Sequence, residues 1–210
     1  MADLGKIAES LIAGKIDDVS NQVKEAIDGG TPAQETLEKG LLAGMNVVGQ
    51  RFKSGEMFIP EVLRSAKAMH AGMEILRPLL SDAENKGAGT LVLGTVEGDL
   101  HDIGKNLVGM MFEGAGFKVI NLGIDLKPQV FVDAVKEHKP DLLGMSALLT
   151  TTMPKMGETI NALKEAGLRD TVKILVGGAP VTAEFAEEIG ADAYAANAAS
   201  SVDKARAVLS

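Results

Sequence analysis

Apolar residues in the first 80 positions of the chain recur at intervals of three and four, which places them on one face of an α-helix. One such helix is predicted to begin at a capping box, with Thr31 as the cap, Pro32 at the first helical position and Gln34 at the third. The predicted helices cover residues 2–13, 17–28, 32–54 and 60–80. Their short connections predict an antiparallel four-helix bundle.

After residue 89 the pattern changes to short, continuously apolar runs that alternate with helical segments. The predicted strands are residues 90–96, 118–123, 142–147, 173–177 and 193–196. The predicted helices are residues 104–115, 128–138, 153–166 and 181–189, with a last one from 199. This alternation predicts an α/β domain of the flavodoxin or Rossmann-like type, in which helices cover both faces of a five-stranded parallel sheet.

A polar, glycine-containing stretch, residues 81–89, separates the two patterns. Because it has no apolar period, it is predicted to link a helical domain, residues 1–85, to an α/β domain, residues 86–210. Gly87 and Gly89 suit a hinge at which the two domains change their relative orientation.

The composition limits the classes of partner. A content of 46% hydrophobic and 24% charged residues is typical of a globular chain, and no apolar run approaches the length of a membrane span. The net charge of −8 argues against nucleic acid, because binding phosphates requires clustered Lys and Arg. Cysteine is absent, and the N-terminal residues lack the pattern of a signal peptide. We therefore expect a cytoplasmic protein without nucleic-acid or membrane partners.

In parallel sheets of this type the ligand lies beyond the carboxyl ends of the strands, so the segments after the strands are the candidate site. These segments are residues 97–106, 146–152 and 177–180. A dinucleotide site would need a glycine fingerprint that the first segment lacks. A free metal ion would need three or four ligands, and Asp99, His101 and Asp102 are the candidates. The remaining interpretation is that His101 is an ordinary loop histidine.

Three short motifs at successive strand ends carry a family resemblance. They are Asp99-Leu100-His101-Asp102-Ile103-Gly104, Ser146-Ala147-Leu148 and Gly177-Gly178. In this order they resemble the cobalamin-binding domain of methionine synthase, corrinoid methyl carriers and adenosylcobalamin mutases. Residues 51–62, followed by Ser65-Ala66, resemble the helical cap of methionine synthase and its relatives. The resemblance covers nearly the whole chain and implies that the four-helix bundle is a cap for the cobalamin-binding domain.

The resemblance implies that the cofactor binds base-off, with His101 replacing the cofactor's own benzimidazole as the lower cobalt ligand. Asp99 would accept a hydrogen bond from the other ring nitrogen and so fix the ring and its tautomer. Thr152 would place a hydroxyl behind that carboxylate. Alternatively, Thr152 caps the helix that begins near Pro154.

The resemblance also implies a pocket for the displaced nucleotide tail of the cofactor. Gly104 would permit close approach of the backbone, Ser146 would hydrogen-bond the tail, and Gly177-Gly178 would leave room for it. The alternative for the glycine pair is an ordinary turn from strand to helix.

The helical half would shield the upper face of the corrin through Phe52, Ile59 and Val62, although the same residues at helical spacing are equally compatible with bundle core. The complete set of cofactor-binding residues that the resemblance implies is Asp99, His101, Asp102, Ile103, Gly104, Ser146, Leu148, Thr150, Thr152, Gly177, Gly178, Phe52, Ile59 and Val62, with His101 on the metal.

The function implied is that of a methyl carrier and not of a complete enzyme, because no substrate-activating zinc site or second catalytic domain is recognisable. The carrier would take a methyl group from a substrate-specific methyltransferase. A second methyltransferase would pass that group to tetrahydrofolate or a thiol coenzyme, and a reductive activator is expected as a further partner. The alternatives are a light-responsive cobalamin sensor, which would need a basic DNA-binding domain, and a cobalamin storage or chaperone protein.

Overall fold

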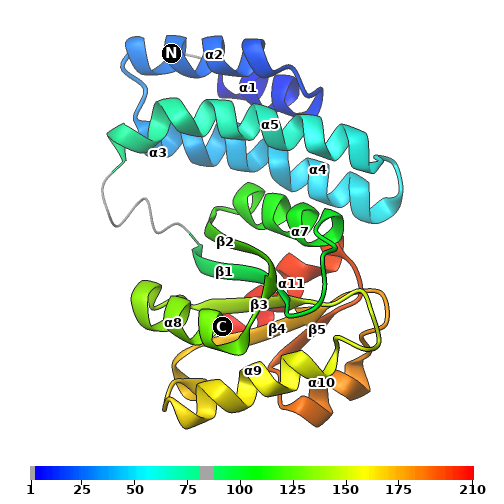
Figure 1. The fold of residues 1–210 in the computed structure, drawn as a ribbon. Coiled ribbons are helices and arrows are strands. Elements are labelled where there is room, and N and C mark those ends of the chain that lie inside the picture. Colours follow the sequence, from blue (N-terminus) through cyan, green and yellow to red (C-terminus); the bar gives the residue numbers. More distant parts are fainter. Residues whose placement is uncertain (1–2, 81–87) are drawn as a thin grey trace. The chain divides into compact units, whose positions relative to one another are not determined.

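The computed structural model describes residues 3–80 and 88–210 (Figure 1). Contacts divide the chain into two compact units, residues 1–88 with 113–117, and residues 89–112 with 118–210. The predicted linker and hinge, residues 81–89, and the predicted domain boundary at residue 85 fall almost entirely on residues 81–87, outside the described residues. None of the helices in the described part of the chain has both the length and the apolar character that a membrane crossing requires.

The first unit is a bundle of amphipathic helices. Its α-helices are α1 (Leu4–Ile12), α2 (Ile16–Asp28), α3 (Ala33–Thr36), α4 (Ala43–Ser54) and α5 (Ile59–Leu76). Helix α5 packs against α2, and α1 packs against both α2 and α4. The fully buried aliphatic residues at this core include Leu11, Val19, Val23, Leu41, Val48, Val62 and Leu76. The predicted helical half is confirmed in outline.

The predicted start of the third helix is wrong. Pro32 has an extended backbone (ψ 140°), so it stands in the cap position that was assigned to Thr31, and α3 begins at Ala33. The Gln34 amide donates to Glu38 further along the helix and does not reach back to the cap. The helix is also not uniform, because residues Leu37–Leu42 form a π-helical segment between α3 and α4. An apolar spacing of three and four does not distinguish this wider turn from an α-helix.

The second unit contains a five-stranded parallel sheet in the order β2-β1-β3-β4-β5. The strands are β1 (Gly89–Val96), β2 (Phe117–Leu126), β3 (Leu142–Ser146), β4 (Lys173–Gly177) and β5 (Ala193–Ala195). The helices are α7 (Ile103–Gly114), α8 (Pro128–His138), α9 (Pro154–Glu165), α10 (Ala183–Ile189) and α11 (Ala198–Leu209). The predicted fold class is confirmed, although β2 extends three residues beyond its predicted end at Gly123.

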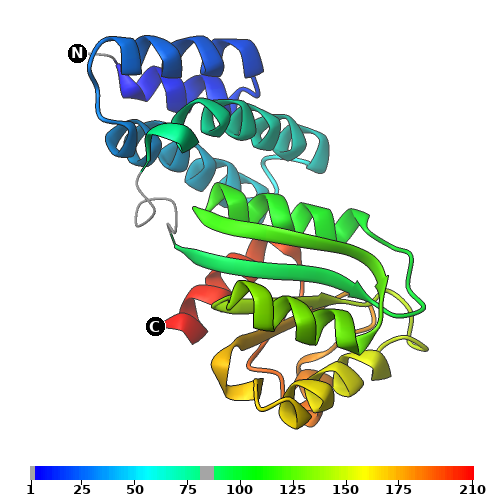
Figure 2. The ribbon, with the colours of Figure 1, turned by 60° about the vertical axis from the view of Figure 1, so that its left-hand side comes forward.

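Helices cover both faces of this sheet, with α8 and α9 on one face and α7 and α11 on the other (Figure 2). Phe131 is the aromatic residue among the buried members of the core between the sheet and the α8–α9 face, and Phe185 and Tyr194 pack against this core partly buried. The chain leaves β1 toward α7 on one face and leaves β3 toward α9 on the other. Strands β1 and β3 are neighbours, so the loops that follow them diverge at this point, which is where doubly wound folds place a ligand.

Candidate functional site

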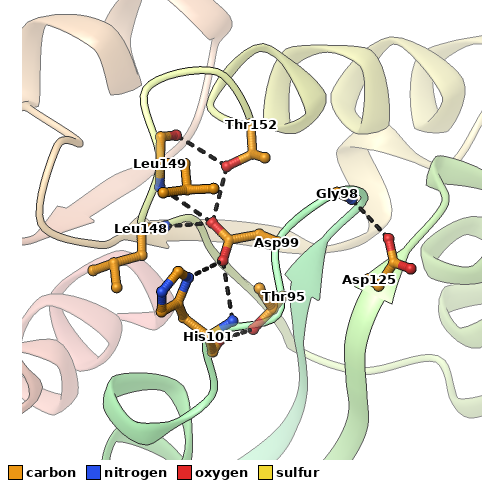
Figure 3. A network of polar contacts seen from close by, with 8 residues as sticks. All are labelled: Thr95, Gly98, Asp99, His101, Asp125, Leu148, Leu149 and Thr152. Carbon is orange, nitrogen blue, oxygen red and sulfur yellow. Dashed lines mark hydrogen bonds and ion pairs between the residues drawn. The ribbon is translucent and has the colours of Figure 1, made fainter.

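The loop between β1 and α7 holds a carboxylate and an imidazole in direct contact (Figure 3). Asp99 Oδ1 lies 2.7 Å from His101 Nδ1 and also accepts the backbone N–H of His101 at 3.1 Å. The two residues are only two positions apart, and the turn that begins at Gly98, with φ +81°, folds the Asp99 side chain back under the ring. The orientation of the His101 ring is therefore fixed by one oxygen of the Asp99 carboxylate, which bonds Nδ1.

The other oxygen of Asp99 is held by the loop after β3. Asp99 Oδ2 accepts the backbone N–H of Leu148 at 2.6 Å, that of Leu149 at 3.2 Å, and the Thr152 hydroxyl at 2.9 Å. Thr152 Oγ1 also lies 2.9 Å from the Leu149 carbonyl oxygen. No side-chain cap hydrogen bond is found at the start of α9, so the alternative assignment of Thr152 as the cap of that helix is wrong.

The Asp99 carboxyl is fully buried, with 0% of the residue exposed. Burial alone would raise its pKa, but the hydrogen bonds from Leu148 N–H, the His101 ring, His101 N–H and the Thr152 hydroxyl outweigh this effect. Together they hold the pKa of the Asp99 carboxyl well below its ordinary value. Asp99 is therefore an anion that is stabilised entirely by protein donors.

An ionised carboxylate accepts hydrogen bonds only, so the contact with His101 places a proton on Nδ1. In the neutral ring Nε2 is then the nitrogen with a free lone pair. The His101 side chain is 52% exposed, in contrast to the buried carboxylate beneath it. The pair thus presents one oriented imidazole nitrogen at the carboxyl edge of the sheet.

Large aliphatic side chains are exposed in the same two loops. Leu100 in the His101 loop is 67% exposed and Ile103, the first residue of α7, is 76% exposed, and Leu148 and Leu149 are 42% and 41% exposed in the loop after β3. Burial of such side chains is favourable, so this grouping next to His101 marks a surface suited to an apolar ligand. Ile103 and Leu148 were predicted as cofactor-binding residues, and this role stays a prediction.

Two further predicted residues lie at the carboxyl end of β3 and in the loop that follows it. Ser146, the last residue of β3, lies opposite Thr95 of β1 on one side and opposite Gly177 of β4 on the other. Thr150 is exposed in the loop after β3. The predicted residues of β3 and β4 therefore share the edge that carries His101.

The predicted glycines differ in what surrounds them. A Cβ added to Gly104 would meet nothing within 4 Å, so space is open beside the first turn of α7. A Cβ on Gly178, which has φ +136°, would lie 1.8 Å from the Ala147 carbonyl oxygen, and one on Gly177 would lie 2.9 Å from that of Ala195. The protein's own backbone therefore requires glycine at these two positions, and their contact with a cofactor stays a prediction.

Asp102 belongs to a polar network beside the loop. Its carboxylate accepts the side-chain amide of Asn106 at 3.0 Å. The Lys105 ammonium, almost fully buried, donates to Asn106 Oδ1 and to Asn121 Oδ1, both at 2.7 Å. Burial lowers the pKa of Lys105. This network, which the sequence analysis did not anticipate, joins the start of α7 to β2.

The three residues predicted to shield the cofactor from the helical side do not have a common environment. Val62 is fully buried and Phe52 is partly buried, whereas Ile59 is 43% exposed. Complete burial of Val62 is what bundle core requires. Contact of any of the three with a cofactor stays a prediction.

The donor set suits a metal that brings its other ligands with it. Among residues 3–80 and 88–210, no group of three or more His, Cys, Asp or Glu side chains is placed to share a metal ion. His101 supplies a single ring nitrogen with a carboxylate behind the other, an arrangement common for metal-bound histidines. The exposed aliphatic side chains and the open space at Gly104 fit a large, largely apolar ring system above and beside that nitrogen.

Comparison with protein families gives two matches. Residues 89–203 match a B12 binding domain family, and residues 4–77 match a second family that is also described as a B12 binding domain.

Relatives of known description are similar over almost the full length. A corrinoid protein of Desulfitobacterium hafniense (strain Y51) is 46% identical over 212 residues, which cover 100% of this chain and 98% of that protein. Trimethylamine corrinoid protein 1 of Methanosarcina acetivorans is 48% identical over 188 residues, 89% of this chain and 87% of that protein. Among solved structures, a chain of the methanol:cobalamin methyltransferase complex MtaBC from Methanosarcina barkeri superposes with a TM-score of 0.90 at 33% identity, over 98% of this chain and 79% of that chain.

Proposed function

Because the chain belongs to the corrinoid proteins with B12 binding domains, we propose that it carries a methyl group on its corrinoid cofactor between two methyltransferases. The cobalt of that cofactor supplies the atom to which the methyl group is attached. The first partner would be specific for a methylated substrate such as a methylamine, methanol or a methoxylated aromatic compound. The second would deliver the methyl group to tetrahydrofolate or a thiol coenzyme, and a reductive activator would restore the carrier after oxidation.

The observation that carries the proposal is the Asp99–His101 pair with its single free imidazole nitrogen. In the base-off, His-on mode that we propose, His101 Nε2 ligates the cobalt while Asp99 keeps the proton on Nδ1. The buried carboxylate makes the imidazole a stronger donor because its negative charge lies 2.7 Å from the ring. Thr152 and the Leu148 N–H hold that carboxylate in place.

The names of the relatives support the proposal that the partners of this chain are methyltransferases. Those relatives are corrinoid proteins of trimethylamine and other systems, and the structural neighbour belongs to a methanol:cobalamin methyltransferase complex. We therefore place the chain as the non-catalytic carrier component of such a system, in the cytoplasm. Residues 1–85 would form the cap over the cofactor, with Phe52, Ile59 and Val62 toward its upper face, and would move aside when a partner engages.

The ligation is tested by paramagnetic resonance of the cobalt(II) form of the purified holoprotein. Nitrogen coupling from an axial imidazole is expected in the wild type and should be absent in His101→Ala, which should still bind some corrinoid. His138→Ala, which replaces a partly exposed histidine at the end of α8, is the matched control and should retain the coupling. Unchanged coupling in His101→Ala would refute the assignment.

The carrier role is tested by methyl transfer. The holoprotein, reduced and mixed with a corrinoid methyltransferase and its methylated substrate, should become methylated and should pass the label to an acceptor when the second methyltransferase is added. A holoprotein that binds corrinoid with His101 on cobalt but accepts no methyl group from any methylamine, methanol or methoxyarene system would instead be a storage protein.

A further inference from the structure

Asp125 of β2, which belongs to none of the sequence motifs, bonds the backbone of the loop that carries His101. Asp125 Oδ1 accepts the backbone N–H of Gly98 at 2.7 Å (Figure 3). The Asp125 backbone N–H donates to the Asp99 carbonyl oxygen at 3.1 Å. Asp125 therefore bonds the N–H of Gly98 and the carbonyl oxygen of Asp99, the two backbone groups that flank the Gly98–Asp99 peptide bond.

The backbone of Asp125 shows that this position is specialised. Its φ is +54°, and it is one of two non-glycine residues with positive φ in the described chain, the other being Lys139 at the end of α8. Asp and Asn enter this left-handed region more readily than other residues with a Cβ. The position thus demands two properties at once, tolerance of the left-handed conformation and a short side chain that accepts a hydrogen bond.

The consequence for the imidazole follows from the chain of contacts. The Asp99 carboxylate meets its donors only if the Asp99 main chain stays in place, and His101 lies on the same turn. The Thr95 hydroxyl fixes the other end of this turn by donating to the His101 carbonyl oxygen at 3.0 Å. Between these two anchors, the ring is bonded to Asp99 through Nδ1.

We infer that Asp125 is a positioning residue for cobalt ligation, which acts on His101 through the main chain of Asp99. The inference rests on the proposed function in taking His101 as the cobalt ligand. The contacts themselves concern only this chain, so part of the test uses the protein without cofactor.

Three substitutions separate the possible roles of Asp125. Asp125→Asn keeps the acceptor and the left-handed tolerance but removes the charge. Asp125→Gly keeps the left-handed tolerance and removes the acceptor. Asp125→Ala removes the acceptor and also places a Cβ-bearing residue without that tolerance at φ +54°.

The matched control lies at the opposite end of β1. Asp141 makes the same pair of contacts with Thr90, accepting its backbone N–H at 2.8 Å and donating to its carbonyl oxygen at 3.1 Å. Asp141→Ala therefore removes an equivalent exposed acceptor of a backbone N–H, at the end of β1 that is opposite to the His101 loop.

The first readout is amide hydrogen exchange in the cofactor-free protein. The Leu148 N–H, which donates to Asp99, should exchange about tenfold faster in Asp125→Gly, the factor that corresponds to roughly one hydrogen bond. It should stay near the wild-type rate in Asp125→Asn and in Asp141→Ala. The second readout is the nitrogen coupling of the cobalt(II) holoprotein, which should be reduced in Asp125→Gly and further in Asp125→Ala, and retained in Asp125→Asn and in the control.

Each outcome decides the inference. Wild-type exchange and coupling in Asp125→Gly would show that the residue serves only the backbone conformation, and loss of both in Asp125→Asn would show that its charge acts instead. Either result overturns the positioning role. If the wild-type holoprotein itself shows no imidazole coupling, the proposed ligation fails, while the exchange of Leu148 still reports whether Asp125 holds Asp99.

Discussion

The two edges of the parallel sheet use carboxylates in opposite ways. At the amino edge Asp192 is partly exposed, accepts the Ile174 backbone N–H at 2.7 Å and pairs with Arg169 at 2.9 Å. At the carboxyl edge Asp99 is fully buried, and no Lys or Arg lies within salt-bridge distance of it in the described chain. Its donors are backbone and side-chain groups of two loops.

At the carboxyl edge, large aliphatic side chains are exposed although the carboxylate is buried. Leu100 and Ile103, which lie close to Asp99 in the sequence, are mostly exposed. Globular proteins normally bury large aliphatic residues and leave carboxylates in water, so the carboxyl edge inverts the usual rule. Local violations of this kind concentrate at functional sites, because the surface is shaped for a ligand and not for folding alone. The amino edge, which follows the rule, serves as the reference for what stability alone requires.

The largest effect is expected from removing the buried carboxylate. In the cofactor-free protein, Asp99→Ala leaves the Leu148 and Leu149 amides without their acceptor, whereas the Thr152 hydroxyl can still donate to the Leu149 carbonyl oxygen; the change should lower the free energy of unfolding by on the order of 3 kcal/mol. The free energy of unfolding of both proteins is measured by urea unfolding monitored by circular dichroism. A loss below about 1 kcal/mol would mean that these donors find water in the variant, and that the carboxyl edge is less closed than its burial implies.

Lowering the pH should reduce the free energy of unfolding through protonation of Asp99. The pKa of this carboxyl is depressed in the folded protein, so the stability it contributes is complete above the ordinary carboxyl value of about 4 and is lost as the pH falls below it. The unfolding free energy of the cofactor-free wild type should therefore fall more steeply below about pH 4 than that of Asp99→Asn, by up to roughly 1.4 kcal/mol per pH unit. Parallel curves for the two proteins between about pH 2.5 and 5 would contradict the depressed pKa.

A smaller loss of unfolding free energy is expected when a carboxylate of the amino edge is removed. Asp192→Ala removes a backbone acceptor and a partly buried ion pair, and should cost about 1–2 kcal/mol of unfolding free energy. Because this edge has no part in the proposed site, the affinity for cobalamin measured by equilibrium dialysis should not change. A matching loss of affinity would show that the two edges are not independent.

The smallest effect on stability is expected from the exposed aliphatic residues. Ile103→Ser should change the free energy of unfolding by no more than about 0.5 kcal/mol, because the side chain is 76% exposed. It should nevertheless weaken cobalamin binding by about tenfold, since it removes apolar area that the ligand would bury. Val130→Ser on α8, at 40% exposure, is the control for an exposed aliphatic residue outside the two loops. Equal affinities in both variants would remove Ile103 from the site.

Hydrophobic patterning indicated which segments hold the candidate site, whereas the pairing of Thr152 with Asp99 was implied only by the family resemblance. Once β1 and β3 are recognised as parallel neighbours, the segments after them must share an edge, and Asp99 and Thr152 meet there although they are 53 positions apart. The backbone donors of Leu148 and Leu149 could not be predicted, because every residue except proline has an N–H and only the loop geometry selects these two.

The remaining differences have similarly local causes. Asp125 was missed because β2 was expected to end at Gly123, whereas the strand continues through residues 124–126. An acidic residue just after the second apolar run was the available signal. In the helical half, the spacing of Val62 indicates that it lies on an apolar face but not what covers that face, so bundle core and cofactor contact could not be distinguished.

The separation along the chain between Asp99 and its donors has a consequence for biosynthesis. Asp99 relies on residues that are 49, 50 and 53 positions further along, so the anchored imidazole cannot exist when His101 is first synthesised. At ordinary translation rates the missing residues follow roughly 2 to 10 seconds later. Until then, a nascent chain has its histidine but not the loop that fixes the carboxylate beneath it. The carboxylate beneath His101 is therefore fixed only in a chain that extends at least through Thr152.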